Sequence, residues 1–114
     1  MMTAPRTIVF AGIGHYALSN LVTLGKNLNI AIKRRGLRQS DIAEATFIAL
    51  PSLRKALRGD PTVSMGGDVT ILSQLQLVDQ LAELASPALD EIGIALAERS
   101  LASRVRIKED KYNI

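Results

Sequence analysis

A group of polar and basic side chains in the middle of the chain has the types and the spacing to contact a nucleic acid. Leu53, Ala56 and Leu57 recur at three- and four-residue intervals and predict the buried face of a short helix over residues 50–58. The remaining face carries Ser52, Arg54, Lys55 and Arg58. Cations and hydroxyls grouped in this way suit phosphate oxygens and base edges. The simpler alternative is a solvated face on an ordinary helical hairpin.

Residues 37–59 as a whole predict two short helices joined by a tight turn. The first begins near Gln39, and its apolar side includes Ala43, a residue small enough to let two helices cross closely. Pro51 falls in the first turn of the second helix, where a missing backbone N–H costs nothing. Gly59 is a typical residue at which such a helix ends.

This segment resembles the helix-turn-helix of the lambda-repressor/Cro-like regulators, often called the Xre family. The residues that carry the resemblance, in order and spacing, are Leu37, Gln39, Ile42, Ala43, Glu44, Ile48, Leu53, Arg58 and Gly59. The resemblance extends over about residues 21–106, and the Gly-Asp-Pro-x-Val-Ser-x-Gly run at residues 59–66 is similar to antitoxins found beside Hip-type kinase toxins. It implies an all-α, lambda-repressor-like DNA-binding domain whose helix 50–58 enters the major groove, and a homodimer on a pseudo-palindromic site.

Three positions depart from the family pattern. Phe47 stands where the turn usually has glycine, so a bulky residue must adopt a left-handed backbone or distort the turn. Ala49 stands where Ser or Thr usually caps the second helix, a loss of about 1 kcal/mol. Leu50 and Pro51 occupy the first base-reading positions. Direct readout therefore depends on Ser52, Arg54 and Lys55, or on apolar contact with thymine methyl groups.

The positive charge of the chain is concentrated around this segment. Residues 26–60 hold eight Lys/Arg and three Asp/Glu, whereas residues 61–114 hold five and eight. Lys33 and the three arginines that follow are suited to a phosphate backbone, although basic residues also favour a helix C-terminus. The full set of candidate DNA-contacting residues is Arg34, Arg35, Arg38, Gln39, Leu50, Pro51, Ser52, Arg54, Lys55 and Arg58.

The remaining apolar periodicity predicts further helices. A stripe over residues 21–32 predicts a helix that ends at Gly36, and residues 69–84 predict two short helices, broken near Gln76, after a loop at 64–67. Residues 92–102 predict another helix. The alternating run at 104–108 predicts a short strand, with a frayed tail as the alternative. The predicted organisation is an N-terminal extension at 1–19, a DNA-binding domain at 20–86 and a C-terminal segment at 87–114. The resemblance to Hip-type antitoxins implies that the C-terminal segment serves dimer or toxin contact, with Val105 and Ile107 as candidates.

The N-terminal residues offer a competing hypothesis. An apolar run precedes Gly12-x-Gly14-x-x-Ala17, the order of a dinucleotide-binding turn, and Arg34 and Arg35 would then meet a 2′-phosphate. A lone glycine pattern is weak evidence, and this hypothesis also requires residues 28–32 to form a strand. We favour an extension that packs Val9, Phe10 and Tyr16 on the core.

Composition excludes several other classes of function. The 114 residues suffice for one modest core, and they include no cysteine and a single histidine, so we expect no disulfide, no metal, no cofactor and no enzymatic activity. No apolar run is long enough to cross a bilayer, and we expect a cytoplasmic protein.

The predicted function is sequence-specific binding of double-stranded DNA by a transcriptional regulator, with autoregulation as the antitoxin of a Hip-type kinase implied by the resemblance. The alternative is a protein-interaction module with a degenerate helix-turn-helix.

Overall fold

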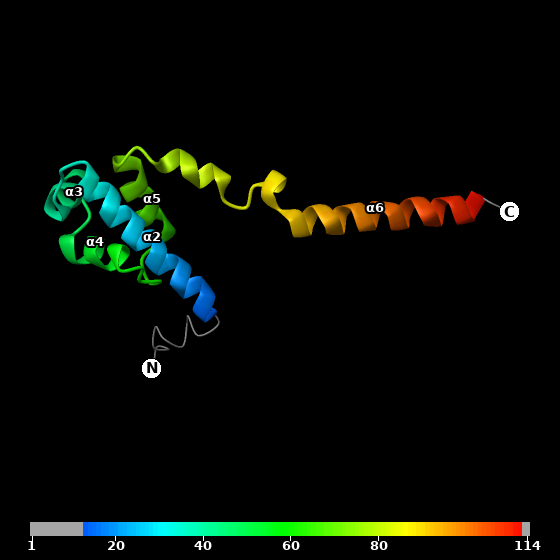
Figure 1. The fold of residues 1–114 in the computed structure, drawn as a ribbon, viewed down its shortest axis with the longest axis horizontal. Helices are drawn as coiled ribbons and strands as arrows, with labels where there is room; N and C mark the ends of the chain where they lie inside the picture. The colour runs from blue at the N-terminus through cyan, green and yellow to red at the C-terminus, as the bar shows by residue number, and fades with distance from the viewer. Residues whose placement is uncertain (1–12, 113–114) are drawn as a thin grey trace, which may run out of the picture. The chain divides into compact units, whose positions relative to one another are not determined.

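Four α-helices form the first part of the fold, as Figure 1 shows for a computed structural model that describes residues 13–112. They are α2 (His15–Arg34), α3 (Gln39–Thr46), α4 (Leu50–Leu57) and α5 (Met65–Gln74). Two short 3₁₀ helices, η1 (Val78–Glu83) and η2 (Pro87–Leu89), precede a last helix, α6 (Glu91–Tyr112). The residues divide into two compact units between Asp79 and Gln80. The predicted all-α class is confirmed, since residues 13–112 contain no strand.

The core of the first unit lies where α2, α3, α4 and α5 meet. α4 packs against both α2 and α3, and α3 also packs against α5. The fully buried large side chains are Leu28, Ile32, Ile42, Leu53, Ile71 and Leu75. Burying one such side chain stabilises the folded state by roughly 1.5–3 kcal/mol. Aliphatic side chains thus hold α4 against both α2 and α3, and α3 against α5.

Two glycines let α2 approach the C-terminal end of α4 backbone to backbone. A Cβ atom on Gly25 would lie 2.5 Å from the carbonyl oxygen of Leu57. A Cβ atom on Gly59 would lie 2.5 Å from the Cα atom of Val22, and Gly59 also has a φ of 76°. Gly59 ends α4 as predicted, and the close contact gives a second reason for glycine at this position.

The run from Gly59 to Ser64 ends α4 and begins α5. Oδ1 of Asp60 accepts hydrogen bonds from the backbone N–H of Thr62 at 2.8 Å and from its hydroxyl at 2.6 Å. Oγ of Ser64 then accepts from the N–H of Gly67 at 3.0 Å and caps α5. The loop expected at residues 64–67 is therefore wrong, because the cap satisfies a backbone donor and the helix begins at Met65.

The break predicted near Gln76 is confirmed. Gln76 has a left-handed backbone with a φ of 61°, and the N–H of Leu77 donates to the carbonyl oxygen of Leu72 at 2.9 Å. This hydrogen bond closes the end of α5. The element that follows, η1, is a 3₁₀ helix without a buried residue.

The strand expected at residues 104–108 is wrong, because these residues belong to α6. The helix begins beside Asp90, whose Oδ1 accepts from the N–H of Gly93 at 2.9 Å. An isolated strand would leave its backbone groups without a ladder, whereas a helix pairs them internally. Arg and Lys also have good helix propensity, so the alternating pattern does not prevent the helix from continuing.

The structure does not confirm the predictions made for the N-terminal residues. Tyr16 lies in the first turn of α2 and is 83% exposed, so its predicted packing on the core is wrong. The dinucleotide-binding hypothesis is contradicted, because residues 28–32 lie within α2 and not in a strand. Val9 and Phe10 lie outside the described residues.

Candidate nucleic-acid interface

The local sequence of α4 separates an apolar face from a polar face. Leu53, Ala56 and Leu57 are buried against the core, as their spacing predicts. Ser52, Arg54 and Arg58 are exposed. Pro51 lies in the first turn, and Ala49 precedes the helix with no side-chain cap. The first N–H groups of α4 therefore have no capping side chain and can meet an external acceptor.

A hollow of about 350 Å³ lies where the C-terminal end of α2 meets the N-terminal ends of α3 and α4. Its lining residues are Asn29, Ile32, Lys33, Leu37, Arg38, Gln39, Ser40, Leu50 and Arg54. Three of these side chains are cationic, and none is a carboxylate. Helix N-termini carry partial positive charge, which adds to the charge of the side chains. The hollow is therefore suited to an anion such as a phosphate group.

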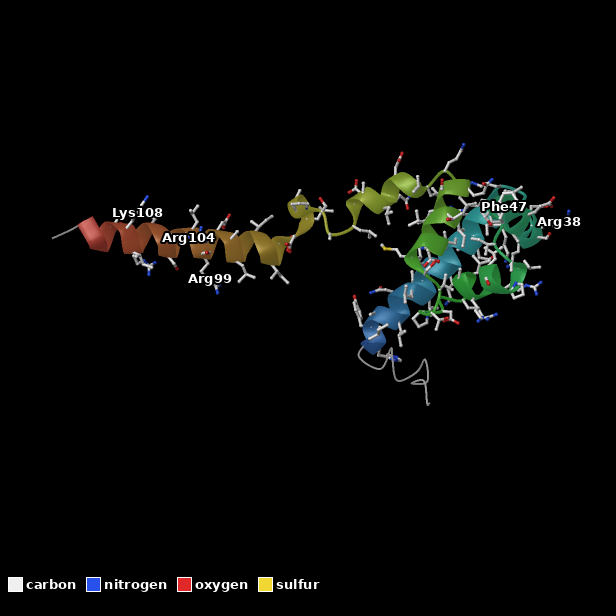
Figure 2. The ribbon with its side chains drawn as sticks, turned by 180° about the vertical axis from the view of Figure 1, so that it is seen from behind. Arg38, Phe47, Arg99, Arg104 and Lys108 are labelled. Carbon is white, nitrogen blue, oxygen red and sulfur yellow. The ribbon has the colours of Figure 1, made fainter. Side chains whose placement is uncertain are left out.

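Arg38 is an exposed residue of this site and has an acidic neighbour. Its side chain is 83% exposed, and its Nε lies 3.6 Å from Oδ2 of Asp41. The same carboxylate oxygen accepts the backbone N–H of Arg38 at 2.8 Å and so fixes the start of α3. Figure 2 shows Arg38 at the edge of the first unit. An exposed ion pair of this kind contributes little to stability and leaves Arg38 accessible to a stronger anion.

Gln39 joins α2 to α3 across the hollow. Its Nε2 donates to Oδ1 of Asn29 at 3.3 Å, and the side chain is half-buried. This bond holds the Gln39 amide near Arg38 and Ser40, where it remains able to contact a ligand. Asn29 is a residue of the site that the sequence analysis did not identify. Its spacing could have indicated it, because Asn29 lies four residues before Lys33 and therefore on the same side of the helix.

Arg35 does not belong to this hollow. Its Nη1 donates to the carbonyl oxygen of Ala31 at 2.9 Å, and its Nη2 donates to that of Leu75 at 2.8 Å. These bonds turn the guanidinium toward the end of α5. We therefore omit Arg35 from the proposed interface and give it a structural role.

The other predicted residues do not line this hollow. Ser52 and Lys55 line a second hollow of about 460 Å³, together with Thr62, Ser64 and Gly67 at the start of α5. Arg34, Pro51 and Arg58 are exposed and line neither hollow. The structure thus brings Arg38, Gln39, Leu50 and Arg54 to one place and separates them from the rest of the predicted set.

The turn before α4 has an unusual residue. Phe47 has φ 58° and ψ 21°, a left-handed backbone, and its side chain is 97% exposed. Left-handed backbone costs a non-glycine residue about 1–2 kcal/mol. The expected strain at this position is therefore confirmed, and no burial of the ring compensates for it. Figure 2 labels Phe47 in the first unit.

Comparisons with protein-family models, with curated proteins and with solved structures found no match. Within residues 13–112, no helix combines the length and the apolar character needed to cross a membrane. The same residues contain no group of three or more His, Cys, Asp or Glu side chains that could hold a metal ion. Interpretation of the site therefore depends on its own geometry and charge.

Proposed function

We propose that this chain binds duplex DNA as a transcriptional regulator, with α3 and α4 acting as a helix-turn-helix. The observation that carries the proposal is the hollow at the ends of α2, α3 and α4, where Lys33, Arg38 and Arg54 converge without a lining carboxylate. An extended polyanion is the ligand best matched to several cations spread over three helix ends.

The lining residues have different roles in this proposal. Lys33, Arg38 and Gln39 lie at the ends of α2 and α3 and contact phosphates, which sets the position of the protein on the duplex. Arg54 projects from the exposed face of α4 and reads a base edge, while Leu50 and Pro51 offer apolar contact to thymine methyl groups. With one basic reader in this part of α4, much of the affinity is electrostatic.

The proposed regulator acts as a homodimer, because one eight-residue helix contacts few base pairs and a two-fold pair doubles the contact.

Autoregulation as the antitoxin of a Hip-type kinase is supported by the sequence of residues 59–66 alone. That run also has a folding role, since Asp60 and Ser64 form the turn and cap between α4 and α5. Co-purification with the product of a neighbouring kinase-like gene tests the antitoxin role separately from DNA binding.

The alternative function is a protein-interaction module. The observation that favours it is Phe47, an aromatic ring that is 97% exposed on a strained backbone. Exposed aromatic side chains are frequent anchors of protein interfaces. In this alternative, Phe47→Ala abolishes partner capture while the cations around the hollow are dispensable.

Fluorescence anisotropy with the upstream DNA of the gene and with a scrambled duplex, at two salt concentrations, tests the proposal. The double variant Lys33→Ala/Arg54→Ala is expected to weaken binding at least about tenfold and to lower the salt slope by about 1–2. Arg99→Ala/Arg104→Ala removes the same charge from α6, at residues that do not line a hollow, and serves as the matched control. Absence of binding at low salt would exclude DNA binding and leave the interaction module.

A further inference from the structure

Helix α6 carries an apolar stripe that is open to solvent. Ile94, Leu101 and Val105 are exposed by 43%, 62% and 47%, and they recur at spacings that place them on one side of the helix. Within its own unit, α6 is contacted by η2 near its start. A helix of 22 residues gains little stability from propensity alone, so an uncovered apolar stripe indicates that another surface packs against it.

The stripe includes a hollow of about 450 Å³ lined by Glu98, Leu101, Ala102, Val105, Arg106 and Glu109. Residues 98, 101, 102 and 105 have the spacing i, i+3, i+4, i+7, and so do residues 102, 105, 106 and 109. Four residues at this spacing form the hole that accepts one side chain of a facing helix. The hollow therefore consists of two overlapping holes, and Ala102 and Val105 belong to both.

We propose that this hollow receives α6 of a second copy of the chain, in antiparallel orientation. When the two-fold axis passes near residue 103, Leu101 of one copy enters the hole at 102–109 of the other. Val105 then enters the hole at 98–105. Each hole is filled by an apolar side chain of the stripe itself, so the surface is self-complementary, as a two-fold interface requires.

Charge selects the antiparallel orientation. In this register Glu98 of one copy lies opposite Lys108 of the other, and the symmetry repeats the pair at the far end of the apolar centre. A parallel pair would place Glu98 against Glu98 and Lys108 against Lys108. Like charges across an interface are unfavourable and exclude wrong pairings.

The proposed contact is small. A few exposed aliphatic side chains from one helix of each copy bury less than the roughly 1,200 Å² at which stable interfaces begin, which predicts a weak, concentration-dependent dimer. The inference assigns a contact surface to the homodimer of the proposed function, and it depends on α6 alone. It can hold if the protein binds no DNA, and it can fail while DNA binding holds.

Sedimentation equilibrium of the full chain without DNA tests the association. Lys108→Glu and Glu98→Lys each replace two attractions by two repulsions and should weaken the dimer about tenfold. The double variant Glu98→Lys/Lys108→Glu restores opposite charges and should recover the wild-type constant. Arg99→Glu makes the same charge change on the opposite side of α6 from Lys108, as Figure 2 shows, and should have no effect.

Crosslinking tests the orientation, because the chain contains no cysteine of its own. Ala95→Cys and Ala102→Cys place one thiol each on the same edge of the helix, seven residues apart. In the antiparallel pair, the thiols at 102 lie near the two-fold axis, while those at 95 are separated by about 24 Å along the helices. A short bifunctional thiol reagent should therefore link Ala102→Cys and not Ala95→Cys. Equal linkage of both, a chain that stays monomeric up to about 1 mM, or a dimer unaffected by the charge variants would overturn the proposal.

Discussion

Arg35 is bound to Leu75 through a hydrogen bond of 2.8 Å from Nη2 to the backbone carbonyl oxygen. The bond joins the C-terminal end of α2 to the residue that follows α5, forty positions later in the chain. The last carbonyl groups of a helix have no partner within it, so a guanidinium that binds one carbonyl from each helix satisfies both ends. Leu75 itself is fully buried, so the hydrogen bond from Arg35 lies at the edge of the hydrophobic core.

Replacement of Arg35 should therefore affect folding. Arg35→Ala removes both carbonyl contacts and should lower the free energy of unfolding by about 1–3 kcal/mol. Urea denaturation measures the loss. Arg34→Ala, at an exposed neighbouring position, is the control and should change stability by less than about 0.5 kcal/mol. Equal stability of the two variants would contradict the structural role of Arg35.

The glycines between α2 and α4 should be sensitive to a single methyl group. Gly25→Ala places a Cβ against the carbonyl of Leu57 and should cost about 1–3 kcal/mol, and Gly59→Ala should cost more because strain from its φ of 76° is added. Gly36 has a φ of 67° with open space around it. Gly36→Ala should therefore lower the free energy of unfolding only by the cost of a left-handed backbone, about 1–2 kcal/mol. A smaller loss for Gly59→Ala than for Gly36→Ala would show that the close contact is absent.

Phe47→Gly should stabilise the protein. The ring is 97% exposed, so its removal loses little packing, while glycine adopts φ 58° without the cost that phenylalanine bears. We expect a gain of about 0.5–1 kcal/mol in the free energy of unfolding, partly offset by the greater entropy of the unfolded chain. Phe47→Ala keeps the strain and removes the ring, and it should leave stability nearly unchanged. A loss of stability in Phe47→Gly would mean that the ring packs on the fold.

Asp68 should give the stability of the protein a measurable pH dependence. Desolvation in the first turn of α5 raises the pKa of Asp68 above its usual value of 3.8. Because the folded state then holds the proton more tightly than the unfolded chain, ionisation of this carboxyl costs stability at neutral pH, and the cost disappears as the pH falls through the raised pKa. Asp68→Asn should be more stable than wild type at pH 7 by less than about 1 kcal/mol, since the group is partly exposed. The difference should shrink toward pH 4, and a difference that grows with acidity would contradict it.

Much of the first unit can be predicted from the sequence, because its helices are indicated by residues that are close together in the chain. Helical spacing of the apolar residues places α2, α3 and α4, and Pro51, Gly36 and Gly59 mark their ends within a residue or two. The left-handed backbone at Phe47 is one of the two outcomes that the resemblance implies, because Phe47 stands where the family usually has a turn glycine.

The remaining features depend on contacts between distant residues. Arg35 belongs to a cluster of four cations in the sequence, and only the position of Leu75 in space distinguishes it from its neighbours. The convergence of Arg38 with Arg54 likewise requires the packing of α3 on α4. The alternating apolar pattern at 104–108 suggests a strand, but strand formation needs a partner strand, which no local pattern can supply.

NMR mapping can show whether duplex DNA is bound at the hollow formed by α2, α3 and α4. A chain of 114 residues is small enough for complete amide assignment, and a short duplex can be titrated into the labelled protein at low salt. We expect the largest changes in chemical shift at Lys33, Arg38, Gln39 and Arg54, with the amides of α6 little affected. Saturating changes elsewhere, or spectra unchanged by DNA, would contradict it.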